Sequence, residues 1–390
     1  MSVTGPHDDR PVRAMTRHAV TTAIALLIAS CAAVSDGLPT PSPDLTGDFR
    51  QGKLDIAYTF LSGTSVHSPG SKQLLNGALE AMRQDVRSAG GSADIATPDF
   101  TTDAATSSGD FKKFAAAAGL LAAKNQKNPG VTADRLADAG IVGMIRADPD
   151  CHTYYRRANG TVSASRPASS RGTGPQIPPG GTAIQAQPDQ AGLQATLLPG
   201  GVAYLTWHAF TINGTYSITD AVRAILDRSV ASGAKAWLFD LRGNIGGNGG
   251  DFMASWFLDG ERTLTVLVRT GDAGTQTANL DLRLVPAYQL PIAIILNDRA
   301  GSAPEVFAAS LRENHRATIV GSLSMGCLGG EIDAPLGSDG SRLYVVKQEY
   351  VGAVSGAHYN NVGIPPDVPA VDTAAVAVAT ELLLRQIAGR

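Results

Sequence analysis

From residue 200 to the C-terminus, apolar segments of strand length alternate with segments of helical periodicity. The strand-like segments are 200–210, 234–244, 262–270, 290–298 and 317–321, and the helix-like ones are 217–233, 249–260, 302–314 and 370–388. Residues 331–351 have the pattern of a hairpin that turns at Ser338-Asp339-Gly340. Because such alternation favours partly parallel strands joined by helices, we expect an α/β core over 201–390.

One strand-to-helix junction in this core contains a small hydroxyl. In ILNDRAGSAPEVFAASL, residues 295–311, the turn contains Ser302, which is followed by Pro304 and Glu305. These three residues are typical of a helix N-terminus with a capping box. The same position also brings a hydroxyl to backbone N–H groups that can stabilise an oxyanion. The G-x-S-x-G form of a nucleophile elbow is absent, so both interpretations stay open here.

The half of the chain before this core contains two segments of different composition. Residues 47–155 contain apolar residues at helical spacing in 71–91, 109–130 and 132–150, which predicts an N-terminal helical domain. Residues 156–200 are rich in Ser, Pro, Gly, Gln and Thr, which predicts a low-complexity linker or lid.

Residues 1–36 have the pattern of a signal peptide. A basic start, a short apolar stretch and small residues follow one another in 15–37, and the stretch is too short to span a bilayer. Ile28-Ala29-Ser30-Cys31 resembles the bacterial lipobox, in which Cys31 would carry the lipid; an ordinary cleaved signal is the alternative. Residues 37–46 have the composition of a tether. We expect a cell-envelope lipoprotein or a secreted protein, with membrane contact through a lipid anchor at most.

Composition and motifs exclude several other functions. The net charge is −3 and charged residues make up 17%, without the basic excess that nucleic-acid binding requires. No H-E-x-x-H or C-x-x-C occurs, so we expect no metal site. The run GNIGGNGG lacks the Lys and Ser/Thr of a phosphate loop, and we expect no cofactor.

Three stretches, in order, resemble the tail-specific (C-terminal processing) and tricorn-core serine peptidases. They are FDLRGNIGGNGG at 239–250, GSAPEVFAASLRENHRATIVG at 301–321 and NNVGIPPDVPA at 360–370. The resemblance implies a crotonase-like (ClpP/crotonase) core of β-β-α units with an N-terminal helical domain. It also implies that Ser302 is the nucleophile, and that the N–H groups of Ala303 and of the Gly246-Gly247 turn form the oxyanion hole.

The sequence departs from the best-known branch of that family. Tail-specific proteases have a Lys general base 25 residues after the Ser, and that position here is Cys327. Residues 156–200 are too few and too polar to form the PDZ domain of that branch, so we expect none. The chain therefore resembles the branch without the Lys, which includes retinoid-binding-protein-like members.

A Ser without the Lys needs another base. His152, in DPDCHTYY at 148–155, resembles the histidine segment of the family, where His is the general base. The alternatives are that His152 is a hydrogen-bonded loop residue, or that His358 is the base. Asn360 stands where the tricorn branch has a Glu, and an Asn amide can hold an imidazole tautomer. His67 lies in an early loop and has no role in this interpretation.

The resemblance also concerns the cysteines. It implies that Cys151 and Cys327 border one cleft, and we hypothesise a disulfide between them. Alternatively both are free, or Cys327 is itself reactive.

The resulting hypothesis is an exported serine peptidase that cleaves peptides or protein chain ends through a Ser-His site. The alternative is a catalytically weak or inactive binding protein on the same fold, for an apolar small molecule or peptide.

Overall fold

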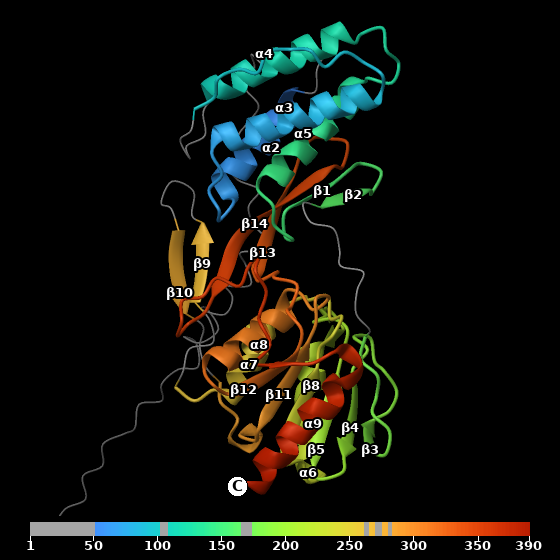
Figure 1. Ribbon diagram of the computed structural model, residues 1–390, viewed down its shortest axis with the longest axis vertical. Helices are drawn as coiled ribbons and strands as arrows, with labels where there is room; N and C mark the ends of the chain where they lie inside the picture. The colour runs from blue at the N-terminus through green and yellow to red at the C-terminus, as the bar shows by residue number, and fades with distance from the viewer. Residues whose placement is uncertain (1–50, 102–107, 165–173, 261–264, 270–274, 280–282) are drawn as a thin grey trace, which may run out of the picture. The chain divides into compact units, whose positions relative to one another are not determined.

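The computed structural model describes residues 51–101, 108–164, 174–260, 265–269, 275–279 and 283–390 (Figure 1). The predicted signal peptide, the tether and Cys31 lie outside the described residues. No helix of the described part is long and apolar enough to cross a membrane.

The core is a seven-stranded mixed sheet with the strand order β15-β12-β11-β8-β5-β4-β3. Its strands are β3 (Thr182–Gln185), β4 (Gln194–Leu198), β5 (Val202–Thr206), β8 (Ala236–Asp240), β11 (Ile292–Leu296), β12 (Ala317–Gly321) and β15 (Val368–Pro369). The strands from β15 to β5 are parallel, and β4 and β3 continue the sheet antiparallel. The expected α/β core with partly parallel strands is confirmed.

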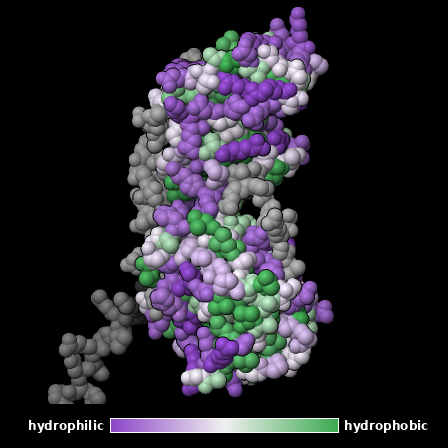
Figure 2. Space-filling view, viewed as in Figure 1, coloured by the Kyte–Doolittle hydropathy of each residue, from purple (hydrophilic) through white to green (hydrophobic). Residues whose placement is uncertain are grey.

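Alternate residues of each core strand enter different apolar clusters. In β8, Trp237 and Phe239 pack with the helices α6 (Ile218–Ala231), α7 (Gly250–Ala254) and α8 (Ala303–Glu313). Leu238 packs on the other face, against α9 (Asp372–Ala388). Burial on both faces explains why these strands are continuous apolar runs. Leu384 of α9 is partly exposed, and Figure 2 shows hydrophobic surface over this helix.

A second, antiparallel sheet has the order β10-β9-β14-β1-β2, and β13 also pairs with β14. Its strands are β1 (Tyr154–Arg156), β2 (Val162–Ala164), β9 (Thr265–Arg269), β10 (Thr275–Asn279), β13 (Gly329–Pro335) and β14 (Arg342–Val351). The predicted hairpin at 331–351 is therefore β13-β14, and it pairs with β1, which follows the helical segment.

The helical segment consists of α2 (Gln51–Thr64), α3 (Ser71–Ser88), α4 (Ser108–Lys124) and α5 (Ala133–Ala147). Its apolar cluster also contains Leu343 and Val345 of β14. Residues from the C-terminal half of the chain thus complete the hydrophobic core of the helical segment, which the division at 155 and 201 did not predict.

Residues 156–200 differ from the expected linker or lid. They form β2, β3 and β4, and β3 and β4 extend the core sheet at its edge. β4 pairs with β3 on one side and with β5 on the other, and its Ala195 and Leu198 are buried, whereas the edge strand β3 pairs with β4 alone. Residues 165–173 of this segment lie outside the described residues.

Candidate active site

Two loops meet at the carboxyl ends of the parallel strands β8 and β11. The Gly301 N–H donates to the Asn244 carbonyl at 3.0 Å, which joins the loop after β11 to the loop after β8. The buried Asn244 side chain donates to the Trp207 carbonyl at 2.8 Å and accepts from the Gly246 N–H at 3.0 Å. Ligands of open α/β sheets bind at this edge, and Ser302 lies there.

Ser302 begins α8 in a backbone conformation that non-glycine residues rarely adopt. Its φ is +70° and its ψ is −122°. The Glu305 carboxylate accepts from the Ser302 N–H at 3.0 Å, which is one arm of the predicted capping box. Strained conformations of this kind cost about 1–3 kcal/mol and persist where the surrounding structure enforces them.

The Ser302 hydroxyl lies beside the ring of His152. The distance from Ser302 Oγ to His152 Nε2 is 3.3 Å, although the residues are 150 positions apart. His152 lies between α5 and β1, and its ring is mostly buried. Gly329 of β13 leaves room for the ring, because a Cβ there would lie 3.0 Å from His152 Nδ1. This pairing has the geometry that a hydroxyl and its general base require.

Asp150, which the sequence reasoning missed, lies on the other side of the ring. Asp150 Oδ1 accepts from the His152 backbone N–H at 2.7 Å and lies 3.5 Å from His152 Nδ1. Asp150 is fully buried. Although burial opposes ionisation, hydrogen bonds from His152 and Asn360 hold the pKa of the Asp150 carboxyl below its usual value. An Asp side chain often accepts a hydrogen bond from the backbone N–H two residues later. The spacing of Asp150 and His152 was therefore the signal in the sequence that could have identified Asp150.

The sequence analysis expected Asn360 to orient the His152 ring, but Asn360 contacts Asp150 and not the ring. Its Nδ2 donates to Asp150 Oδ2 at 2.5 Å instead. The Asn360 amide therefore does not reach the imidazole, because the Asp150 carboxylate lies between them. The physical reason is the tight turn at Asp150, which fills the space beside His152 Nδ1.

A disulfide joins Cys151 to Cys327, with their Cα atoms 5.8 Å apart. Cys327 Sγ lies 3.8 Å from His152 Nδ1, so the bridge packs against the ring. The sulfur and ring nitrogen atoms lie within 4.8 Å of one another, close enough for metal ligands. Sulfur atoms bound in a disulfide, however, offer no thiolate to a metal.

The expected oxyanion donors do not all keep a free N–H. The Gly246 N–H is occupied by the Asn244 side chain. In the described part of the chain, no hydrogen bond from the N–H of Gly247 or Ala303 is present. Gly246 instead allows a close approach: its φ is +94°, and a Cβ there would lie 2.6 Å from the Ser302 Cβ.

His358, the rival base, lies elsewhere. Its Nδ1 is 2.9 Å from Glu349 Oε1, and its side chain is 63% exposed. Among the described residues it makes no contact with Ser302.

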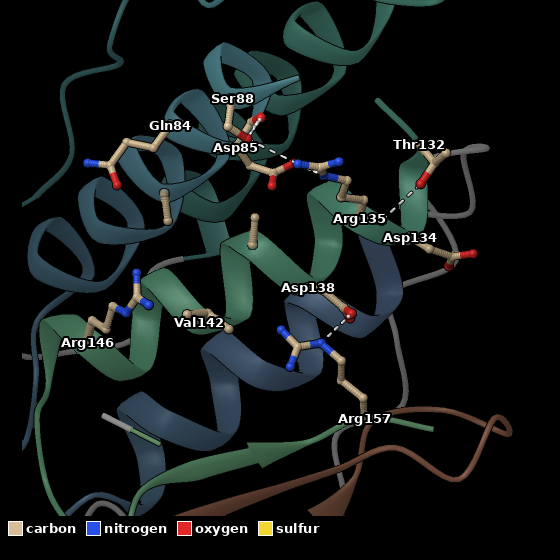
Figure 3. A pocket seen from close by; sticks show the side chains of 12 residues that line it. Gln84, Asp85, Ser88, Thr132, Asp134, Arg135, Asp138, Val142, Arg146 and Arg157 are labelled. Carbon is tan, nitrogen blue, oxygen red and sulfur yellow. Dashed lines mark hydrogen bonds and ion pairs between the residues drawn. The ribbon is translucent and has the colours of Figure 1, made fainter. Parts of the chain in front are cut away.

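A separate groove lies on the helical segment, between α3 and α5 (Figure 3). Asp85 and Arg135 face one another across it at 2.7 Å, and Asp138 accepts from Arg157 at 2.8 Å. The charges along this groove are largely paired, and none of the candidate active-site residues lines it.

The family model of peptidase family S41 matches residues 201–370 of the chain. This confirms the resemblance drawn from the three motifs. The carboxyl-terminal-processing peptidase 3 of Arabidopsis thaliana is 30% identical over 168 residues, which are 42% of this chain and 31% of that protein. The carboxy-terminal processing protease CtpA of Bacillus subtilis is 28% identical over 165 residues, 42% of this chain and 33% of that protein. This chain thus spans about a third of the length of these curated relatives.

Two solved structures resemble most of the chain in fold. A lipoprotein from Streptococcus agalactiae has a TM-score of 0.52 and 13% identity, over 88% of this chain and 98% of that one. A structure described as a peptidase from Parabacteroides merdae has a TM-score of 0.51 and 18% identity, over 80% of this chain and 96% of that one. The likeness concerns the fold alone and extends beyond the segment 201–370.

Proposed function

We propose that this protein is an exported serine peptidase that cleaves peptides or protein chain ends through a Ser302-His152-Asp150 site. The observation that carries the proposal is the 3.3 Å distance from Ser302 Oγ to His152 Nε2, with the buried Asp150 carboxylate beside the ring. The match of residues 201–370 to the model of peptidase family S41 supports the same chemistry. Asn360 enters as a residue that positions Asp150.

In the proposed reaction His152 removes the proton from the Ser302 hydroxyl as Oγ attacks the carbonyl carbon of the substrate. The negative charge on the carbonyl oxygen would be stabilised by the N–H groups of Ala303 and Gly247. The imidazolium then gives its proton to the leaving amine, and water hydrolyses the acyl-enzyme with His152 again as base. Asp150 stabilises the imidazolium, which an Asn amide in its place would do less well.

The substrate class is argued from the fold and from the relatives. Peptides bind enzymes of this kind as extended strands, through main-chain hydrogen bonds. The matched relatives are carboxyl-terminal processing peptidases by name, which supports cleavage near a chain end here. The parallel strands β5, β8, β11 and β12, with helices on both faces, support a crotonase-like core.

Export is proposed on two grounds. The segment 1–36 has the composition of a lipoprotein-type signal peptide with Cys31 as the lipid-bearing residue. The disulfide between Cys151 and Cys327 also suits an oxidising compartment.

Labelling with a fluorophosphonate probe tests the activity without a known substrate. We expect the wild-type chain to be labelled and Ser302→Ala to remain unlabelled. Ser310→Ala is the matched control, because Ser310 lies on the same helix and its buried hydroxyl donates to the Val306 carbonyl at 2.6 Å. Labelling that persists in Ser302→Ala, or no labelling of the wild type, would instead favour the binding protein.

A further inference from the structure

A second imidazole lies behind Asp150, on the side away from Ser302. His67, in the loop after α2, has its Nε2 3.6 Å from Asp150 Oδ2 and its Nδ1 3.1 Å from Asp148 Oδ1. The His67 side chain is 25% exposed, while Asp148 and Asp150 are almost fully buried. Asp150 therefore lies between two imidazoles, those of His67 and His152.

The surroundings of His67 are strongly acidic. Asp148 and Asp150 face it at short range, and Glu349 of β14 acts on it from further away. The hydrogen bond with Asp148 raises the pKa of His67 above its usual value despite the opposing effect of burial, and the charges of Asp148, Asp150 and Glu349 add to the rise. Two buried carboxylates need compensating charge, and His67 is the cation within reach of both.

The two carboxylate oxygens of Asp150 have different partners. Oδ1 faces His152, while Oδ2 receives the Asn360 amide at 2.5 Å and faces His67. The carboxylate is thus held from its far side by an amide and by a cation. Asp148, the other partner of His67, also accepts from the Ser65 hydroxyl at 2.6 Å, which fixes the opposite end of the contact.

We propose that His67 is a positioning residue of the active site, whose imidazolium binds Asp148 and Asp150 together and shares the Asp150 carboxylate with the His152 ring. This role rests on the proposed function. His67 touches neither Ser302 nor the His152 ring in the described structure, so it acts through Asp150 alone. Nothing in the sequence marked it, because it lies far from every matching motif.

The charges of His67, Asp150 and His152 give the direction in which the loss of His67 changes the protonation of His152. The His67 cation shares the negative charge of Asp150 with His152. If His67 loses its charge, Asp150 acts on His152 alone and stabilises the imidazolium more strongly. A protonated His152 cannot accept the Ser302 proton, so the acid limb of the pH–rate profile moves to higher pH.

The experiment compares the wild type with His67→Gln, which keeps a polar side chain without the charge. The rate of fluorophosphonate labelling is measured from about pH 5 to about pH 9, the range in which imidazoles titrate. We expect the acid limb to move up by about one pH unit, so labelling below the limb slows about tenfold. His315→Asn is the control, because His315 ends the same helix that Ser302 begins and has a φ of +54° that Asn tolerates.

A second readout does not depend on activity. The ring signal of His152 in the NMR spectrum, assigned with His152→Gln, is followed with pH in the wild type and in His67→Gln. We expect it to change at higher pH in His67→Gln. An unchanged His152 signal overturns the inference, whether or not the protein is labelled. A shifted signal without any Ser302-dependent labelling supports the coupling and rejects the peptidase function instead.

Loss of the cation removes one partner from each of two buried carboxylates and so destabilises the folded chain. The double variant His67→Gln/Asp148→Asn removes one of these charges together with the cation. We expect it to fold and to show a smaller shift in the same direction, because the loss of the Asp148 charge offsets part of the effect of the lost cation on His152. A folded double variant with the wild-type pH dependence overturns the inference.

Discussion

The buried carboxylate of Glu305 accepts a hydrogen bond of 2.7 Å from the backbone N–H of Cys327. The same carboxylate accepts from the Ser302 N–H at 3.0 Å. Cys327 is bonded in turn to Cys151, whose neighbour is His152. One buried acid thus connects the backbone of the proposed nucleophile with the backbone of its proposed base.

Glu305→Gln should destabilise the protein and slow the labelling of Ser302. Two carboxylate oxygens receive four donors, from Ser302, Ser324, Gly326 and Cys327, whereas an amide has a single acceptor oxygen and adds donors of its own. Burial raises the pKa of Glu305, but these donors favour a carboxylate in this place. We expect a loss of about 2–4 kcal/mol in urea unfolding. Glu80→Gln, on the exposed face of α3, should unfold like the wild type; equal stability of both variants would refute the bridging role.

Asp150→Asn should lower kcat, because an amide cannot stabilise the His152 imidazolium by charge. A decrease of about 10⁴-fold is typical for the loss of the acid in such a site. The double variant Asp150→Asn/Asn360→Asp exchanges the two side chains that meet at 2.5 Å. We expect it to recover only part of the rate, since the acid then lies beyond the amide. Full recovery would show that position 360 orients the base equally well.

Gly246→Ala should abolish labelling. A Cβ at this position would lie 2.6 Å from the Ser302 Cβ and 2.8 Å from the Gly301 carbonyl oxygen. Gly160→Ala is the matched control, because Gly160 also has a positive φ, +81°, but has no atom within 4 Å of the added Cβ. Both variants bear a backbone cost of about 1 kcal/mol, so a labelling defect confined to Gly246→Ala isolates the contact with Ser302. Equal labelling of the two would argue against close packing at Ser302.

Opening the disulfide should slow labelling and lower stability. The bridge closes 176 residues, and loss of such a link costs about 2–5 kcal/mol. It also lets the Cys151-His152 turn move away from Ser302. We expect a thiol reductant to reduce the labelling rate and the midpoint of thermal unfolding of the wild type. The double variant Cys151→Ala/Cys327→Ala should be slow from the start and insensitive to reductant. If reductant changes neither quantity in the wild type, the bridge has no part in holding the base.

The free energy of unfolding should fall as the pH rises above 6.5, the usual pKa of a histidine. The pKa of His67 is raised in the folded state, chiefly by its hydrogen bond with Asp148. A group with a raised folded pKa contributes its full stabilisation below the unfolded pKa and loses it as the pH rises through the folded pKa. Urea unfolding at a series of pH values should show this fall in the wild type and a flatter curve in His67→Gln. Parallel curves would contradict the assignment.

Local patterns predicted most of the elements around Ser302. The strand before it and the helix after it were predicted because apolar periodicity and capping residues act over a few positions. The sequence placed β11 and α8 within two residues of their bounds, Ile292–Leu296 and Ala303–Glu313. It placed the hairpin β13-β14 but not its partner, since pairing with β1 joins segments far apart in the chain.

The sequence by itself determined the elements, the alternation that makes the core α/β, and the identity of the Ser and His that the motifs carry. The tertiary structure alone decided what Asn360 contacts. Asn360 and Asp150 are 210 positions apart, so only packing decides that the Asn360 amide meets the Asp150 carboxylate and not the imidazole. The contact of His67 with two buried carboxylates was likewise decided by packing. The burial of these groups and the distances between them, which set their pKa values, exist only in the folded chain.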